Sequence, residues 1–222
     1  HTDQGTVHAV RDISFSVGES EAVGIVGESG SGKSVTMYSV MGLLAGNGSI
    51  TGGSVSLNGQ EITESAFPDH KAYEAAMDQI RGNQMAMIFQ DPMTFLNPVV
   101  KIGKQITEVI KNHQKVTDAE ARARAIELMG QVGIPSPEKR LNQYPHEFSG
   151  GMRQRIIIAI ALANNPKLII ADEPTTALDV TIQAQVLDLI RDMKEKMNSS
   201  VIMVTHDLGV VASLCDRILI MY

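Results

Sequence analysis

The sequence has only one cysteine, Cys215, among its 222 residues. A single cysteine excludes an internal disulfide and suits a reducing compartment such as the cytoplasm. Its neighbours Leu214, Ile218 and Leu219 are apolar, so we expect a buried and unreactive thiol rather than a reactive one.

The sequence also lacks a long apolar run and an excess of basic residues. The longest strongly apolar segment, residues 156–163, is too short to cross a bilayer, and no secretion signal is visible. Lys and Arg number 19 against 25 Asp and Glu, giving a net charge of -6. This balance does not suit a nucleic-acid-binding protein, although it leaves room for a local basic patch. Any membrane role must therefore be carried by a partner chain.

The length and composition suit a sizeable globular unit. With 43% hydrophobic residues, the chain can form one large α/β domain or a core with a subdomain. It opens on His1 without a methionine and stops in a strand-like run over residues 217–222. Such ends are typical of a fragment of a longer protein.

One short stretch, residues 27–34, reads Gly-Glu-Ser-Gly-Ser-Gly-Lys-Ser and fits the phosphate-binding pattern G-x-x-x-x-G-K-[ST]. The apolar residues 22–26 before it predict a buried strand, and residues 35–44 after it predict a helix. Backbone N–H groups of the loop and the helix start would favour phosphate oxygens. Lys33 would contact the terminal phosphates and Ser34 would bind Mg²⁺. The alternative is a Gly/Ser-rich surface turn that binds nothing.

The residues expected to bind the nucleotide all lie in or next to this stretch. They are Gly27, Ser29, Gly30, Ser31, Gly32, Lys33, Ser34 and Val35.

Apolar runs that end in polar clusters predict a mostly parallel sheet. Residues 85–89, 168–171 and 201–204 are such runs, and helical patterns separate them. Parallel strands interleaved with helices place a ligand at the carboxyl ends of the strands. Partial alternation in residues 7–17 and 51–57, the latter followed by Asn58-Gly59, predicts an additional antiparallel layer.

No strand pattern occurs between Phe95 and Ala163, which predicts a helical insertion over residues 93–163. Residues 102–111 look helical, and Thr117 with Glu120 forms a capping-box pattern before a helix over residues 118–129. We therefore expect one domain over residues 1–222, whose α/β core comprises residues 1–92 and 164–222. Further helices are expected over residues 72–80, through residues 155–164, and after the N-cap Asp179.

Two adjacent acids follow the second of these strands. Asp172 would emerge at the strand tip, opposite Ser34, where a Mg²⁺ ligand is needed. Glu173 would take a proton from a water that attacks the γ-phosphate. The alternative is a pair of acids that only starts a turn before Pro174.

Gln90 and His206 each end another strand of the set. A single His or Gln after a strand is more often a capping or core residue than a catalytic one. Here the strands deliver both side chains to the same edge as Asp172 and Lys33. We therefore expect Gln90 to coordinate Mg²⁺ or the attacking water, and His206 to bind the γ-phosphate.

Ser149, Gly150 and Gly151 precede another helix and form a second anion-favouring helix start. A second phosphate site in the same monomer would be redundant. We therefore expect this segment to contact the nucleotide of a neighbouring subunit.

These motifs, in this order along nearly the whole chain, resemble the nucleotide-binding subunit of an ATP-binding cassette (ABC) transporter. Residues 89–98, 144–155 and 173–181 are similar to the oligopeptide, dipeptide and nickel importer branch. Residues 27–36 and 41–44 are similar to the first of the two ATPase types that these importers usually pair. The resemblance implies a P-loop NTPase fold with ATP and Mg²⁺, and adds Asp179 to the residues that contact a partner's nucleotide.

The resemblance also implies partners and a location. The partners are transmembrane permease subunits, a second ABC ATPase subunit paired head to tail as a homo- or heterodimer, and indirectly a solute-binding protein. The location is the cytoplasmic face of the membrane, and no nucleic acid is involved. The implied function is ATP-driven peptide import. Import of nickel or glutathione, a non-transport ABC ATPase acting on DNA or ribosomes, and a cassette that no longer hydrolyses ATP are alternatives.

Three departures from the family pattern stand out. The aromatic residue that normally stacks on adenine would fall before His1. Phe148 and Met152 replace the usual Leu and Gln around the intact Ser149-Gly150-Gly151 core. A C-terminal cysteine-containing extension for an iron–sulfur cluster is absent from these residues, and Cys215 alone supports no cluster.

Overall fold

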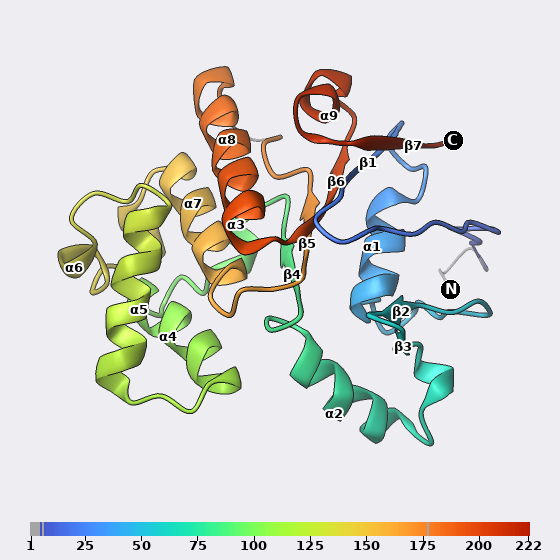
Figure 1. Cartoon of the computed structure of the whole chain (residues 1–222), viewed down its shortest axis with the longest axis horizontal. Coiled ribbons are helices and arrows are strands. Elements are labelled where there is room, and N and C mark those ends of the chain that lie inside the picture. The colour runs from blue at the N-terminus through green and yellow to red at the C-terminus, as the bar shows by residue number, and fades with distance from the viewer. Residues whose placement is uncertain (1–4, 6, 177) are drawn as a thin grey trace.

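The computed structural model describes residues 5, 7–176 and 178–222 (Figure 1). Its main sheet has the strand order β4-β5-β6-β1-β7. The strands are β1 (Ala22–Gly27), β4 (Met85–Ile88), β5 (Leu168–Asp172), β6 (Ser200–Thr205) and β7 (Arg217–Met221). All neighbours in this sheet pair in parallel, which confirms the predicted core.

The register of the sheet brings the polar strand ends to one edge. Ile88 pairs with Ala171, and Asp172 pairs with Val204. Val26 pairs with Thr205, so the loop after β1 begins beside the end of β6. The residues that follow these strands are therefore neighbours, although they are far apart in the sequence.

The predicted antiparallel layer is smaller than expected. Strands β2 (Ser56–Leu57) and β3 (Gln60–Glu61) form a hairpin around Asn58 and Gly59, which confirms the turn. Both turn residues have positive φ, 51° and 78°, as this tight type of turn requires.

The strand predicted over residues 7–17 is wrong, because no strand forms in this segment. The apolar alternation here serves packing instead: Phe15 and Val17 lie against a buried apolar cluster, while Val7 and Ile13 are exposed. Arg217 donates a hydrogen bond to the Ser16 carbonyl and so ties the segment to the sheet edge through a side chain.

The helices confirm most of the predicted elements, with shifts at their ends. α1 runs over Lys33–Met41 and stops at Gly42, whose φ of 64° ends it before the predicted Leu44. α7 begins at Gly150, directly after its cap Ser149, which confirms the helix start predicted at residues 149–151, and it ends at Ala161, before the predicted Asn164. The others are α2 (His70–Ile80), α3 (Pro92–Phe95), α4 (Ile102–His113), α5 (Asp118–Gln131), α6 (Pro137–Arg140), α8 (Val180–Met197) and α9 (Leu208–Leu214), with 3₁₀ turns at Glu64–Ala66 and Pro145–Glu147.

Helices cover both faces of the sheet, as a parallel sheet requires. Alternate strand residues face opposite sides: Ile169 and Ala171 pack in a cluster with α4, α5, α7 and α8. Ile170 packs in the other cluster, with α1 and α2. Figure 1 shows α4 to α7 to the left of the sheet, α1 to its right and α2 below it.

No strand occurs among the described residues between Phe95 and Ala163, as predicted. The capping box at Thr117 and Glu120 is present. Within the described part of the chain, no helix combines the length and the apolar character needed to span a membrane. The division into residues 93–163 and the remaining core stays a prediction.

Cys215 is partly buried and packs against the cluster that contains Ile169. Burial raises the pKa of its thiol to about 11. Because the thiolate is the nucleophilic form, this side chain is unreactive near neutral pH, in line with its apolar sequence neighbours.

Arg81 links the end of α1 to α2, and its loss is expected to destabilise the fold. Its guanidinium donates to the carbonyls of Met41 and Gly42, both at 2.9 Å, and to Glu74 Oε2 at 3.0 Å. It thereby binds the carbonyls that end α1 and holds the pKa of Glu74 below its usual range.

We expect Arg81→Met to lower the free energy of unfolding by about 2 kcal/mol, since hydrogen bonds from a charged donor are lost. Urea unfolding measures this change. The matched control is Arg122→Met, because Arg122 makes no ion pair with the described residues. Equal unfolding midpoints for both variants would contradict the role of Arg81.

Candidate active site

The glycine-rich loop joins β1 to α1 at the polar edge of the sheet. Gly30 and Gly32 have φ values of 86° and 90°, which side-chain-bearing residues rarely adopt. At Gly32 a Cβ atom would also lie 2.5 Å from the Ala9 carbonyl oxygen. The loop can therefore turn its backbone toward the start of α1 only with glycine at these positions.

Lys33 is almost buried, with 6% of its surface exposed. Its Nζ donates to the carbonyls of Gly27 and Glu28, both at 2.7 Å. The ammonium group thus closes the loop around itself, beside the N-terminal end of α1. A cation and a helix N-terminus at one place favour a phosphate group.

Ser34 and Asp172 meet across the base of the loop. The Ser34 hydroxyl donates to Asp172 Oδ1 at 3.0 Å, and Asp172 is only 1% exposed. Burial raises the pKa of Asp172, against the lowering effect of the Ser34 hydrogen bond. A divalent cation would offset the cost of burying this charge.

These oxygen donors fit Mg²⁺, which prefers a few protein oxygens together with water and phosphate. Among the described residues, no group of three or more His, Cys, Asp or Glu side chains is placed to hold a metal ion. The Ser34 hydroxyl and the Asp172 carboxylate suit a metal ion whose remaining ligands are water and the phosphates of a bound nucleotide.

The side chains of Gln90 and His206 both reach Glu173. Gln90 Nε2 donates to Glu173 Oε2 at 3.1 Å, and His206 Nδ1 lies 3.4 Å from Glu173 Oε1. Glu173 itself has a φ of 45°, a strained value for a residue with a side chain. The predicted meeting of these strand ends is present, with Glu173 at its centre.

The segment 149–151 lies in a separate hollow of about 370 Å³, the Ser149 hollow. Ser149 caps α7 by accepting a hydrogen bond from the Met152 N–H at 3.3 Å, and Asp179 caps α8 in the same way from Ile182 at 3.0 Å. Two helix starts thus face one hollow. It is lined by Ser149, Gly150, Gly151, Met152, Arg155, Leu178, Asp179 and Ile182, and no residue of the loop 27–35 is among them.

A family model for the ABC transporter matches residues 10–176 of this chain. The chain belongs to the ABC transporter family.

Relatives in this family carry peptide-transport names. The oligopeptide transport ATP-binding protein OppD of Bacillus subtilis is 53% identical, over 98% of this chain and 59% of its own length. OppD of Escherichia coli is 52% identical, over 100% of this chain and 63% of its own length. The dipeptide transport ATP-binding protein DppD of Lactococcus lactis is 50% identical, over 100% of this chain and 62% of its own length. The chain thus spans about three fifths of the length of the curated relatives it matches.

Solved ABC cassettes share the fold. The cassette MJ0796, in a dimeric post-hydrolysis state bound to ADP and Pi, superposes with a TM-score of 0.82 at 27% identity, covering 100% of this chain and 89% of its own. The cbiO1 component of a Clostridium perfringens ABC transporter complex superposes with a TM-score of 0.79 at 25% identity, covering 100% of this chain and 80% of its own. The predicted α/β P-loop fold of the ABC type is confirmed.

Two residues beside the candidate active site are not among those predicted from the sequence. Thr176 donates a hydrogen bond to Glu173 Oε2 at 2.7 Å, through a turn that apolar periodicity does not mark. Tyr38 lies close to Asp172, and burial together with that charge raises the pKa of its hydroxyl. Its spacing of four residues from Ser34 on α1 places both on one helix face.

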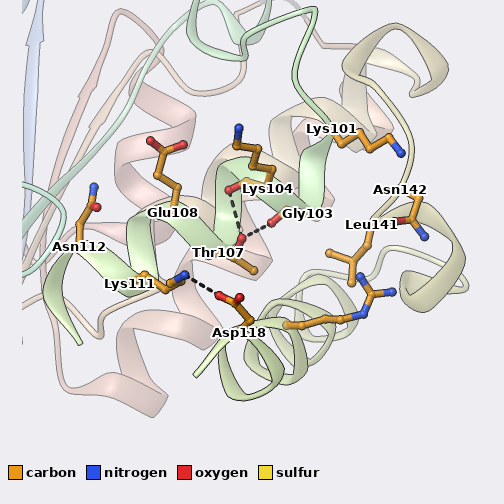
Figure 2. Close-up of a pocket in the computed structure, with 11 residues that line it drawn as sticks. Lys101, Gly103, Lys104, Thr107, Glu108, Lys111, Asn112, Asp118, Leu141 and Asn142 are labelled. Carbon is orange, nitrogen blue, oxygen red and sulfur yellow. Dashed lines mark hydrogen bonds and ion pairs between the residues drawn. The ribbon is translucent and has the colours of Figure 1, made fainter. Parts of the chain in front are cut away.

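A second hollow, of about 570 Å³, lies on the helical segment away from these groups (Figure 2). We call it the Lys104 hollow; Figure 2 shows α4 along it, with Leu141 and Asn142 opposite. Lys111 and Asp118 form an ion pair at its edge. None of the predicted nucleotide-site residues lines it.

Proposed function

We propose that this chain is the ATP-binding and ATP-hydrolysing subunit of an ABC importer that takes up oligopeptides or dipeptides through separate membrane subunits. The observation that carries the proposal is the meeting of the Lys33 loop, the Ser34–Asp172 pair and Glu173 at one sheet edge. The names of the OppD and DppD relatives support peptides as the transported class.

The residues divide the work of hydrolysis among them. Lys33 contacts the terminal phosphates, while Ser34, Gln90 and Asp172 hold Mg²⁺. The bound metal supplies charge that neutralises the phosphate oxygens. Glu173 accepts a proton from the attacking water, and His206 donates a hydrogen bond to the γ-phosphate.

The chain works as half of a head-to-tail pair with a second ABC ATPase subunit. The Ser149 hollow supports this arrangement. Two helix starts line it and favour an anion, but the phosphate-binding loop 27–35 of the same chain contributes no residue to it. Ser149, Gly150, Gly151 and Asp179 therefore complete the nucleotide site of the partner. The dimeric MJ0796 cassette has a closely similar fold.

The membrane permease docks on the segment between Gln90 and Lys101. Its Phe95 is partly exposed and stacks on Phe89 with ring centroids 4.8 Å apart, and Val99 is 79% exposed. Exposed apolar side chains in a short segment suit a protein partner. This docking would hold the chain at the cytoplasmic face of the membrane, with a solute-binding protein on the far side.

Replacing Lys33 tests the proposed nucleotide site. We expect Lys33→Ala to lower ATP hydrolysis by at least ~10²-fold, since one positioned charge near the reacting phosphates is worth that much. We also expect weaker ATP binding by calorimetry, because Lys33 closes the loop on Gly27 and Glu28. Lys71→Ala, on the exposed side of α2, is the control. Unchanged binding and hydrolysis in Lys33→Ala would refute the site.

A further inference from the structure

We propose that Thr176 is a positioning residue that fixes the carboxylate of Glu173 for attack by water. The inference rests on the proposed ATPase activity and on Glu173 as its base. The Thr176 hydroxyl donates to Glu173 Oε2 at 2.7 Å, the shortest of the hydrogen bonds that the described side chains make to this carboxylate.

The local backbone explains why Thr176 reaches Glu173. Residues 173–176 form a turn that closes with a hydrogen bond from the Thr176 N–H to the Glu173 carbonyl at 3.3 Å. Pro174 stands at the second position of this turn, where its fixed φ is favourable. The Glu173 N–H donates to Val204 on β6 at 2.9 Å, which anchors the start of the turn to the sheet. The turn thus folds the fourth side chain back onto the first.

The other contacts of Glu173 come from more distant parts of the chain and are longer. Gln90 follows β4 and lies 3.1 Å from Oε2, and His206 follows β6 and lies 3.4 Å from Oε1. Movement between these segments would change both distances. Thr176 belongs to the same turn as Glu173, so its contact persists when the segments shift.

The donors also distinguish the two carboxylate oxygens. Among the described side chains, Thr176 and Gln90 both donate hydrogen bonds to Oε2, whereas Oε1 has only the longer contact with His206. Oε1 is therefore the oxygen that accepts the proton. As the water oxygen bonds to the γ-phosphorus, its proton passes to Oε1, and the bond from that phosphorus to the β-phosphate oxygen breaks to leave ADP.

Two variants separate positioning from simple support of the turn. In the full-length protein assembled with its partner subunits, Thr176→Val keeps the size of the side chain and removes the donor. We expect its kcat to fall about tenfold with KM for ATP unchanged, as for the loss of one hydrogen bond to a charged group. Thr176→Ser keeps the hydroxyl, and we expect it to retain nearly full activity.

Thr107→Val is the matched control, because within the described residues the Thr107 hydroxyl donates only to backbone carbonyls of α4. In a Glu173→Gln background, Thr176→Val should cause no further loss, since Thr176 acts through Glu173. A normal kcat in Thr176→Val, an equal loss in Thr176→Ser, or a further loss in that background would overturn the inference. Normal hydrolysis by Glu173→Gln alone would instead refute the proposed base.

Discussion

Glu173→Gln is expected to slow ATP hydrolysis by at least ~10²-fold while ATP binding stays intact. Glutamine is nearly the same size as glutamate but cannot take a proton from water. Glu173 lies outside the loop that Lys33 closes, and its described side-chain contacts are with Gln90, Thr176 and His206. Binding of the phosphates should therefore survive.

Phosphate release and calorimetric ATP binding, measured on the same samples, separate these two effects. Glu195→Gln is the matched control, because Glu195 lies on the exposed side of α8. If Glu173→Gln turned over ATP at the normal rate, another group would have to be the base.

Gly151→Val is expected to slow ATP hydrolysis as strongly as Glu173→Gln, by at least ~10²-fold, without weakening ATP binding to the isolated chain. A Cβ atom at Gly151 would lie 2.8 Å from Ile182 Cγ2, so a larger side chain would close the Ser149 hollow against α8. The loop around Lys33 is not part of that hollow and should keep its affinity. Gly130→Val is the control, since a Cβ atom there meets nothing within 4 Å.

Mixing two inactive variants distinguishes a shared site from a complete one. A Lys33→Ala chain paired with a Gly151→Val chain contains one intact composite site, made from the loop of one and the Ser149 hollow of the other. If the protein pairs with copies of itself, half of the randomly formed dimers are mixed, and each mixed dimer has one intact site of two. We therefore expect roughly a quarter of normal activity. Activity that stays at the level of the separate variants would contradict a shared site between copies of this chain.

The meeting of the active-site groups was predictable because parallel strands end at a common edge. Apolar runs before Gln90, Asp172 and His206 were enough to place these residues together. The glycine and lysine pattern of the loop was equally direct, since few other sequences allow that backbone.

The features that sequence patterns missed depend on tertiary contacts or local turns. Residues 7–17 alternate like a strand, yet no neighbouring strand pairs with them. Thr176 reaches Glu173 through a turn that begins at Glu173, whose φ is positive, and hydrophobic periodicity cannot detect such a turn. α7 stops at Ala161, three residues before the predicted Asn164, because residues 162–164 form a turn instead of continuing the helix.

ATP hydrolysis per chain, measured over a dilution series beside analytical ultracentrifugation, tests most directly whether this chain carries half of a nucleotide site. We expect activity per chain to fall as the protein dissociates to monomers, and to return when the chain or its partner ATPase subunit is added back. Constant activity per chain at dilutions where only monomers sediment would contradict the half-site account.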